Sequence, residues 1–460
     1  MDCGSTIALN ASSNAVRSWI SPPDIRGHLD IVISCGVTVV LCGWSSLCVS
    51  VPCPGNERWD IIWDKWHLFC LTVLGPEFTF LLALGQYRSA CESVTLFQSS
   101  GYDDWTLKHG FFADMGGIVL QPCGWSSFPI DAKQLHYLVT QRHIEYPAID
   151  KSIIDDKNKA DAFVRLITLS QILWFTVNTL ARPFNALAIT TLELTTLGFI
   201  FCTFGTEFCW RKKPMDVQSP IVLQCDYPLD QILREGGPDA SRPYQLTPLD
   251  FIRREEWVAS ILWAYYVNIL RMLNLVRQRE RVRPIQRFSS FKFHKISFQN
   301  SILAVIFTSA YGAIFVAAWD FHFPSFGERL AWQITSVMMV FLGIFGGLYE
   351  ILPFPIDLES LSQAISSSGL SLMLSRYLSP SLAEESSKFI SKFWDRLRNN
   401  SPNRDPALDI PLGTFVVTIP VCAAYTLCRI YILTEDIIGL RELPASVFQR
   451  VRWSDFWPHF

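Results

Sequence analysis

The chain has 460 residues and a formal net charge of −3, so it lacks the basic balance expected of a protein that binds nucleic acid. Hydrophobic residues make up 50% of it and charged residues 18%, whereas soluble globular proteins carry about 25% charged residues. This composition argues against a soluble protein and favours a membrane protein.

Long apolar segments recur along the chain, with polar stretches between them. The hydrocarbon core of a bilayer is about 30 Å thick and an α-helix rises about 1.5 Å per residue, so a crossing helix needs about 20 apolar residues. The sequence therefore predicts an all-α fold, a polytopic transmembrane helical bundle of about seven spans. The predicted spans lie near residues 33–51, 67–86, 163–181, 187–207, 301–319, 330–351 and 413–434.

An eighth apolar segment, Trp257–Leu275, contains Asn268 and Arg271 and leads into a basic run. We interpret it as an amphipathic helix at the membrane interface, with the basic run near anionic lipid head groups. Eight spans are the alternative. The basic run consists of Arg277, Arg279, Arg281, Arg283 and Arg287.

The predicted spans divide the chain into alternating segments, including three long polar loops. None of these loops has the length and apolar content that predict a separate domain. The segments are an N-terminal polar segment (1–32), the first two spans (33–86), a polar loop with a glycine-rich motif (87–162), the third and fourth spans (163–207), a polar and basic loop with the amphipathic helix (208–300), the fifth and sixth spans (301–351), a serine-rich polar loop (352–412), the last span (413–434) and a C-terminal tail (435–460).

Signals for orientation conflict. The first thirty residues lack a basic stretch followed by an apolar one, so the first span is expected to act as the insertion signal. Asn10 begins a glycosylation sequon, which requires a lumenal N-terminus. Arg211, Lys212 and Lys213 directly follow the fourth span and favour a cytosolic location for that same side. The orientation stays open, and the endoplasmic reticulum and the plasma membrane are the favoured locations.

The thirteen cysteines include no CxxC pair and no metal-ligand spacing, so we expect most of them to be small apolar fillers. Two pairs are free to form disulfides, Cys48 with Cys53 and Cys91 with Cys123. Neither a metal nor a cofactor is expected.

Two carboxylates violate the apolar pattern of the spans, and an ionisable group at that depth is costly and often functional. Glu77 lies eleven residues beyond Trp66, roughly 16 Å into its span, and Pro76 can kink the helix there. Glu193 lies about 10 Å into the fourth span, among threonines that can hydrogen-bond to it. Both are candidate acid/base groups; the alternative is that both are protonated acids that hold helices together.

Two other features accompany these carboxylates. Arg429 in the last span is a candidate charge partner for Glu193 or Glu77, although a side chain that reaches the interface is the alternative. His109 and Asp114 belong to a glycine-rich motif, residues 109–117, whose spacing matches no metal site. This motif predicts a re-entrant or interfacial loop that closes a cavity, with an ordinary packed loop as the alternative.

Several motifs are absent from the sequence: a Gly-rich phosphate loop, GxSxG, HExxH and paired Asp-rich motifs. Their absence disfavours a nucleotide-driven pump, a serine hydrolase, a zinc protease and a metal-dependent prenyltransferase. A metal-free acid/base enzyme and a secondary transporter remain.

The motifs together resemble a family of uncharacterised filamentous-fungal multi-pass integral membrane proteins, over about residue 22 to the C-terminus. This resemblance implies a fungal source and a membrane location but no reaction. The strings that carry it are Arg26–Ile31, Leu41–Trp44, Pro76–Phe78, His109–Gly117, Thr191–Leu194 and Trp453–His459.

The leading hypothesis is an accessory or acid/base enzyme, of cyclase or isomerase type, that acts on a lipophilic intermediate of a fungal specialised-metabolite pathway. Glu77 and Glu193 would donate and accept the proton, with His109 and Asp114 near the mouth of the cavity. One alternative is a proton-coupled secondary transporter or channel for a small molecule that uses the same carboxylates. Another is a seven-span sensor or scaffold. Membrane lipids and a lipophilic small molecule are the expected partners.

Overall fold

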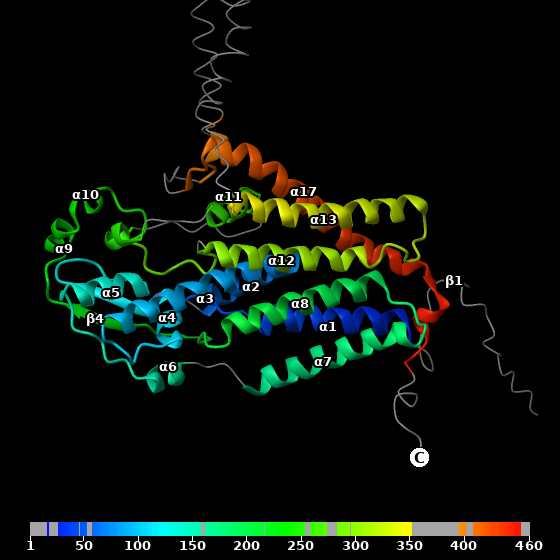
Figure 1. Cartoon of the computed structure of the whole chain (residues 1–460), viewed down its shortest axis with the longest axis horizontal. Helices are drawn as coiled ribbons and strands as arrows, with labels where there is room; N and C mark the ends of the chain where they lie inside the picture. The colour runs from blue at the N-terminus through cyan, green and yellow to red at the C-terminus, as the bar shows by residue number, and fades with distance from the viewer. Residues whose placement is uncertain are drawn as a thin grey trace, which may run out of the picture.

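Helices occupy the segments that hydropathy marks as apolar, and six long ones lie side by side in a bundle (Figure 1). They are α1 (His28–Ser45), α7 (Ala162–Phe184), α8 (Thr191–Trp210), α12 (Phe298–Val316), α13 (Phe326–Ile351) and α17 (Leu412–Ile438). The computed structural model describes residues 16–17, 26–45, 47–52, 58–157, 162–215, 217–253, 258–273, 283–294, 296–351, 394, 396–401 and 408–451.

Helix α8 lies in the interior of the bundle and contacts α1, α3, α7, α12 and α17. Helices α12 and α13 form an antiparallel hairpin, and α17 packs against α13 while crossing the other helices obliquely (Figure 1). The buried core around α8 and α17 is rich in aromatic side chains, among them Tyr311, Phe315 and Trp332.

Three helices are long and apolar enough to cross a membrane: Phe298–Val316, Phe326–Tyr349 and Thr414–Arg441. A fourth candidate is the bent pair formed by α2 (Arg58–Leu74) and α3 (Pro76–Ser99). The fold is therefore helical with three or four candidate spans among the described residues, and the number seven is not confirmed. Helix α8 falls short of the others in hydropathy because it contains Glu193, Glu207 and five threonines.

The predicted second span, residues 67–86, is not one continuous helix. Helix α2 ends at Leu74 and α3 begins at Pro76, and the two helix axes are bent by 118° at Gly75. Proline lacks the backbone donor that would continue α2, but it fits the first turn of a new helix. A Cβ at Gly75 would lie 2.6 Å from both the Phe78 ring and the Tyr425 hydroxyl, so any larger residue between the helices would push these side chains aside.

The first two polar loops fold together at one end of the bundle, which corrects the all-α prediction. Strands β2 (Ile118–Pro122), β3 (Phe128–Pro129) and β4 (Ile221–Cys225) form a sheet in the order β3-β2-β4. Strands β2 and β4 are parallel and pair two identical tetrapeptides in register, from Ile118 opposite Ile221 to Gln121 opposite Gln224. Their β-branched residues favour strands, but neither strand can form a sheet without the other loop.

We call this part of the protein the polar body, residues 100–157 and 217–253. It has its own apolar core, in which Trp105, Phe112, Leu135 and Leu249 are fully buried. Its helices are α4 (Leu107–Asp114), α5 (Ala132–Thr140), α6 (Lys151–Lys157), α9 (Leu229–Glu235), α10 (Gly237–Ala240) and the 3-10 helix η1 (Pro248–Ile252). Helix α3 links it to the bundle by packing against α4, α5 and α8.

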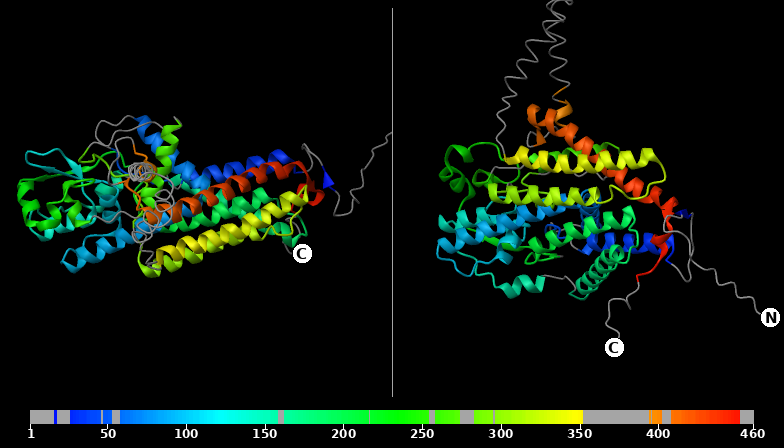
Figure 2. Two further views of the ribbon diagram at one scale, coloured as in Figure 1. Left: turned by 90° about the horizontal axis from the view of Figure 1, so that it is seen from above. Right: turned by 45° about the vertical axis from the view of Figure 1, so that its right-hand side comes forward.

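At the opposite end of the bundle, the residues before α1 meet those after α17 (Figure 2). Strand β1 (Val16–Arg17) pairs with β5 (Leu443–Pro444), which follows the 3-10 helix η3 (Gly439–Arg441) and precedes η4 (Ala445–Phe448). The Arg26 amide donates a hydrogen bond to the Phe448 carbonyl over 3.0 Å. The start of α1 and the end of α17 therefore both lie at the end of the bundle away from the polar body.

The remaining predictions concern individual segments. Helix α11 (Val258–Met272) occupies the eighth apolar segment, and its 15 described residues rise about 22 Å, less than the thickness of a bilayer core. Cys91 and Cys123, one of the two candidate disulfide pairs, are both free thiols. The other candidate pair, Cys48 with Cys53, stays a prediction because Cys53 lies outside the described residues. Other predictions outside the described residues are Asn10, most of the basic run, the centre of the serine-rich loop and the C-terminal motif.

Candidate functional site

The break between α2 and α3 places Glu77 inside the bundle. Glu77 is 5% exposed and lies in the first turn of α3, where the partial positive charge of a helix N-terminus favours a carboxylate. Its Oε1 accepts a hydrogen bond of 2.5 Å from the hydroxyl of Tyr425 on α17. A side chain 348 residues further along the chain therefore holds the predicted acid in place.

Arg429, one turn beyond Tyr425 on α17, satisfies the carbonyls at the end of α2. Its Nε donates to the Leu74 carbonyl over 2.7 Å and its Nη2 to the Val73 carbonyl over 3.4 Å. Tyr425 also donates to the Leu74 carbonyl, over 3.3 Å. The last carbonyls of a helix have no partner within the helix, and in an apolar interior such groups have to be paired. Arg429 therefore stabilises the interruption itself.

The Arg429 side chain is fully buried and surrounded by aromatic rings. Its guanidinium carbon lies 5.7 Å from the ring centroid of Phe199, 5.8 Å from that of Tyr311 and 5.6 Å from that of Phe315. Contacts of this kind stabilise a desolvated cation. The charge of Arg429 also acts on the Glu77 carboxylate, although the two side chains form no ion pair within 4 Å in the described part of the chain. Of the two carboxylates proposed as its partner, Arg429 lies near Glu77.

The hydrogen-bonding capacity of these groups is not exhausted. Among the described residues, Oε2 of Glu77, Nη1 of Arg429 and the hydroxyl of Tyr311 are buried and have no hydrogen-bond partner. A buried polar atom that lacks a partner is costly. The site can therefore accept a proton, a water molecule or a polar solute without losing any contact.

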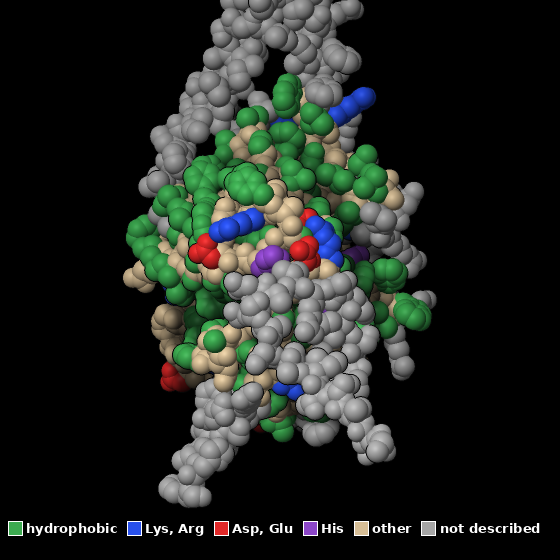
Figure 3. Space-filling model, turned by 90° about the vertical axis from the view of Figure 1, so that its right-hand side faces the viewer, with side chains coloured by type: hydrophobic (Ala, Val, Ile, Leu, Met, Phe, Trp, Pro, Cys, Tyr) green, Lys and Arg blue, Asp and Glu red, His purple; other side chains and the backbone are tan. Residues whose placement is uncertain are grey.

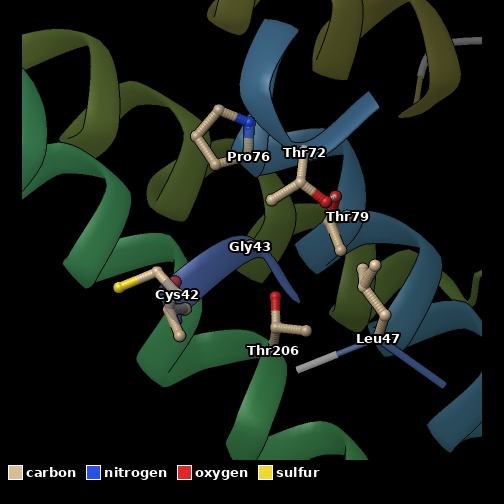
Figure 4. A pocket seen from close by; sticks show the side chains of 8 residues that line it. Cys42, Gly43, Leu47, Thr72, Pro76, Thr79 and Thr206 are labelled. Carbon is tan, nitrogen blue, oxygen red and sulfur yellow. Dashed lines mark hydrogen bonds between the residues drawn. The ribbon is translucent and has the colours of Figure 1, made fainter. Parts of the chain in front are cut away.

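A small pocket lies beside the break, between α1, α2, α3 and α8 (Figure 4). Its volume of about 10 Å³ is close to the space needed for one water molecule. The hydroxyls of Thr72 and Thr79 hydrogen-bond to each other across the break, over 2.9 Å. The pocket is lined by apolar groups together with four threonines, and it has no room for a molecule larger than water. Its lining residues are Cys42, Gly43, Leu47, Thr72, Pro76, Thr79, Thr203 and Thr206.

Glu193, the second predicted carboxylate, lies in a different environment. It is fully buried at the start of α8, where its Oε2 accepts hydrogen bonds from the Thr190 amide and hydroxyl, each over 3.0 Å. Its other oxygen pairs with Arg26. Glu77 lies near a different part of α8, because its charge acts on Cys202. Cys202 follows Glu193 by nine residues, which is a helical rise of about 13 Å. The structure does not bring Glu77 and Glu193 to one cavity.

The predicted loop motif around His109 and Asp114 is helix α4 followed by a turn, within the polar body. His109 caps this helix, because its Nδ1 accepts from the Thr106 amide over 3.1 Å and its Nε2 donates to the Ile149 carbonyl over 2.8 Å. Burial lowers the pKa of His109. A Cβ at Gly110 would lie 2.5 Å from the Ser93 hydroxyl, so this glycine permits close packing of α4 on α3.

Asp114 closes α4 and faces a polar cluster at the junction of the polar body and the bundle. One of its oxygens accepts from the Ala132 amide over 3.1 Å, and the Ser89 hydroxyl also interacts with the carboxyl group. Burial raises the pKa of Asp114, while the charge of Arg253 opposes that shift. Arg253 in turn donates to Nδ1 of His294 over 2.8 Å and to Ser89 over 3.1 Å. His109 and Asp114 therefore lie in the polar body, apart from the site at the helix break.

Sequence reasoning missed Tyr425, and it treated Lys213 as a topological signal. Lys213 is buried, and its Nζ donates to Oε1 of Gln86 over 2.8 Å and to the Cys48 carbonyl over 2.9 Å. Burial lowers its pKa to about 8. The available signal for Tyr425 was its spacing of four from Arg429, which places both on one face of the last span.

No cluster of three or more His, Cys, Asp or Glu side chains suited to a metal ion occurs in the parts of the chain that the structure describes. The groups at the helix break are suited to proton transfer and to binding a polar or charged species, through one carboxylate, one guanidinium and two phenol hydroxyls.

Comparison with known proteins adds a family but no activity. No curated protein and no solved structure matches the chain. A family of unknown function (DUF8562) matches residues 5–234, a region that includes Glu77, Glu193, His109 and Asp114 but ends before Tyr425 and Arg429. Because this match spans half of the sequence, the chain belongs to the family of unknown function DUF8562.

Proposed function

We propose that the protein is a multi-pass membrane transporter that moves a small polar molecule in exchange for, or together with, protons, with Glu77 as the proton-binding group. The observation that carries this proposal is the interrupted helix at the centre of the bundle. Secondary transporters commonly bind solutes and coupling ions where a discontinuous helix exposes backbone and polar groups near the middle of the membrane.

We propose a topology of six crossings, by α1, α7, α8, α12, α13 and α17, with α2 and α3 as a re-entrant pair. The bend of 118° supports this, because it returns α3 toward the end of the bundle at which α2 begins (Figure 2). An even number of crossings also agrees with the pairing of β1 and β5 at one end. A seventh crossing by α2 and α3 would separate these two strands.

Outward-facing apolar side chains support crossings by α1 and α7, which are not among the three helices that are both long and apolar enough to cross a membrane. On α1, Ile33 and Val40 are more than half exposed. On α7, Leu166, Leu173 and Trp174 are also more than half exposed. A row of large apolar side chains on the outside of a bundle is costly in water and favourable against lipid chains. We therefore propose that lipid covers both helices.

In this proposal, protonation of Glu77 removes the negative charge that Arg429 stabilises. The hydrogen bond from Tyr425 to Glu77 weakens at the same time, because a charged acceptor binds more strongly than a neutral one. Helix α17 then holds the re-entrant pair only through the Leu74 and Val73 carbonyls. This loosened state opens the small pocket at the break to the solute.

The acid/base enzyme is less well supported by the geometry. Such an enzyme needs both catalytic carboxylates at one cavity of substrate size, whereas Glu193 is paired with Arg26 about 13 Å along α8 from the Glu77 side of the bundle. No specific contact favours a sensor or scaffold.

The first experiment is an untargeted metabolite profile, measured separately in cells and medium. It compares a deletion strain complemented with the wild type, with Glu77→Gln, or with the control Glu145→Gln, which changes an exposed glutamate of the polar body. Transport predicts that an unchanged compound is trapped in, or lost from, the deletion and Glu77→Gln cells, while Glu145→Gln behaves as the wild type. A precursor that accumulates while its product disappears from both fractions would indicate an enzyme and overturn the proposal.

Proton coupling is tested with purified protein in liposomes that contain a pH-sensitive dye. When the medium supplies the compound identified by the profile, the wild type should acidify or alkalinise the lumen. Glu77→Gln should lower that rate at least tenfold and Glu145→Gln should not. Equal rates for the wild type and Glu77→Gln would show that Glu77 does not bind the coupled proton.

A further inference from the structure

A second carboxylate lies inside the bundle, on the same face of α17 as Tyr425 and Arg429. Asp436 follows Arg429 by seven residues, which is two helical turns and about 10 Å of rise. It is 1% exposed, and neither of its carboxylate oxygens has a hydrogen-bond partner among the described residues. An unpaired buried carboxylate is costly and is normally relieved by a proton or a cation.

Two hydroxyls of α8 lie beside this carboxylate, but neither contact has the geometry of a full hydrogen bond. Thr191 and Thr195 are close enough to Asp436 to interact with it. Thr195 is 2% exposed, and its hydroxyl completes no hydrogen bond in the described structure. A protonated carboxyl would donate to such a hydroxyl and would remove both unpaired groups together.

The charges around Asp436 leave it without a cationic partner of its own. Arg429 acts on it from two turns away, but its guanidinium is held by the α2 carbonyls. Glu435, on the same helix, adds a negative charge. Cys35 on α1 and Tyr311 on α12 also lie within electrostatic range. At this end of the bundle, the cation Arg26 is paired with Glu193.

The site lies close to the aqueous end of the bundle that is opposite the polar body. Figure 3 shows this end, where a few charged and histidine side chains lie beside hydrophobic ones. Two ion pairs occur here, Arg329 with Asp320 and Arg441 with Glu328, and His322 lies 4.0 Å from Glu442. Arg441 is about half exposed and follows Asp436 by only five residues. A proton at Asp436 therefore has a short route to water.

We propose that Asp436, with Thr195 and Thr191, is a proton-binding site that exchanges with the aqueous phase at this end of the membrane. This inference goes beyond the proposed function, because a proton can bind to Asp436 in a protein that transports nothing. If Glu77 is also a proton site, Asp436 is the group on α17 through which protons from this side approach it.

Infrared difference spectroscopy of the full-length protein in lipid tests the proposal. A protonated carboxyl gives a C=O stretching band distinct from the bands of carboxylates, and changing the pH of the buffer should make such a band appear and disappear. Asp436→Asn should abolish one C=O band and leave the rest of the titration unchanged. The control Asp320→Asn removes an exposed carboxylate at the same end and should leave that band in place.

Thr195→Val provides a second variant that keeps Asp436 itself. It should change the frequency of the same C=O band, because the hydroxyl no longer interacts with the acid. A band present in Asp436→Asn, or unmoved in Thr195→Val, would assign the proton elsewhere. A spectrum that responds to sodium against choline at constant pH, with the response lost in Asp436→Asn, would identify a sodium site and overturn the proton assignment.

None of these spectra depends on flux. Loss of the band in Asp436→Asn together with unchanged flux in Glu77→Gln would refute the proposed function and support the site at Asp436. The reverse pattern would refute the site and leave the proposed function standing.

Discussion

Replacing Arg429 by methionine tests whether the interrupted helix depends on a charge carried by α17. Arg429 donates two hydrogen bonds to α2 carbonyls, over 2.7 and 3.4 Å. Its positive charge also acts on the carboxylate of the buried Glu77. Methionine fills a similar volume among the aromatic rings but supplies neither donors nor charge. Removing one partner of a buried charged network costs about 3–5 kcal/mol, mostly because the remaining charge is left uncompensated.

Part of the network survives in this variant and limits the loss. The Leu74 carbonyl still accepts from Tyr425 at 3.3 Å, whereas the Val73 carbonyl loses its side-chain donor. A lost hydrogen bond from a charged donor costs about 1.5–3 kcal/mol, so the carbonyls account for about half of the expected total and Glu77 for the rest. We therefore expect Arg429→Met to lower the free energy of unfolding by about 3–5 kcal/mol and the melting temperature by several degrees.

Buried thiols provide the assay. Cys42, Cys202 and Cys209 are each at most 3% exposed, so a thiol-reactive fluorogenic dye reports their exposure as purified protein is heated. The double variant Glu77→Gln with Arg429→Met should recover about 1–3 kcal/mol relative to Arg429→Met, because the uncompensated carboxylate is gone. Arg329→Met, at an exposed ion pair, is the control and should melt with the wild type. A melting curve of Arg429→Met that overlays the wild type, or a double variant that is no more stable than Arg429→Met, would refute the reasoning.

Three further predictions concern the break and the polar junction. Gly75→Ala should lower the free energy of unfolding by about 1–3 kcal/mol, since its Cβ would meet Phe78 and Tyr425 at 2.6 Å. Gly36→Ala is the control: no atom lies within 4 Å of its Cβ, so in the same thermal melt it should be neutral or slightly stabilising. Burial lowers the pKa of Lys213 from 10.5 to about 8, so between these values the unfolded chain binds more protons than the folded protein, and stability should rise with pH by about 3 kcal/mol. Lys213→Met should remove that rise, and a rise that persists in the variant would assign it to another group. Burial, together with the charges of Arg253 and Lys292, lowers the pKa of His294 well below 6.5, so the stability of the folded protein should fall as the pH drops below 6.5. His294→Gln should reduce this loss of stability at acidic pH, measured as melting temperatures over a series of buffer pH values. An unchanged loss of stability would exclude His294 as its source.

Hydropathy predicts the long helices because lipid and a buried core demand the same apolar residues. The segments 301–319, 330–351 and 413–434 correspond to α12, α13 and α17 with small shifts at their ends. The break at Gly75 was foreseeable only as a kink at Pro76, because its direction depends on contacts with Tyr425 and Arg429. Distant contacts of this kind leave no local pattern.

The sheet of the polar body shows a different limit of sequence reasoning. Strand β4 has only five residues and no hydrophobic periodicity of its own, and about a hundred residues separate it from β2. The repeated Ile-Val-Leu-Gln at 118–121 and 221–224 was the one visible sign that they pair. For the candidate site, the apolar pattern of the span predicts that Glu77 is buried, as the structure shows, but its partners come from elements that no spacing rule connects to it.

The parallel pairing of β2 and β4 also orders the assembly of the protein. During synthesis, β2 leaves the ribosome about a hundred residues before β4, and a contact so distant in sequence forms late. Helices α7 and α8 lie between the two strands in the sequence, so in the proposed topology β2 keeps an unpaired edge until this hairpin has crossed the bilayer and returned the chain to the same side. A nascent chain in which α7 and α8 fail to insert would keep that edge exposed, and the cell could detect the failed insertion through it.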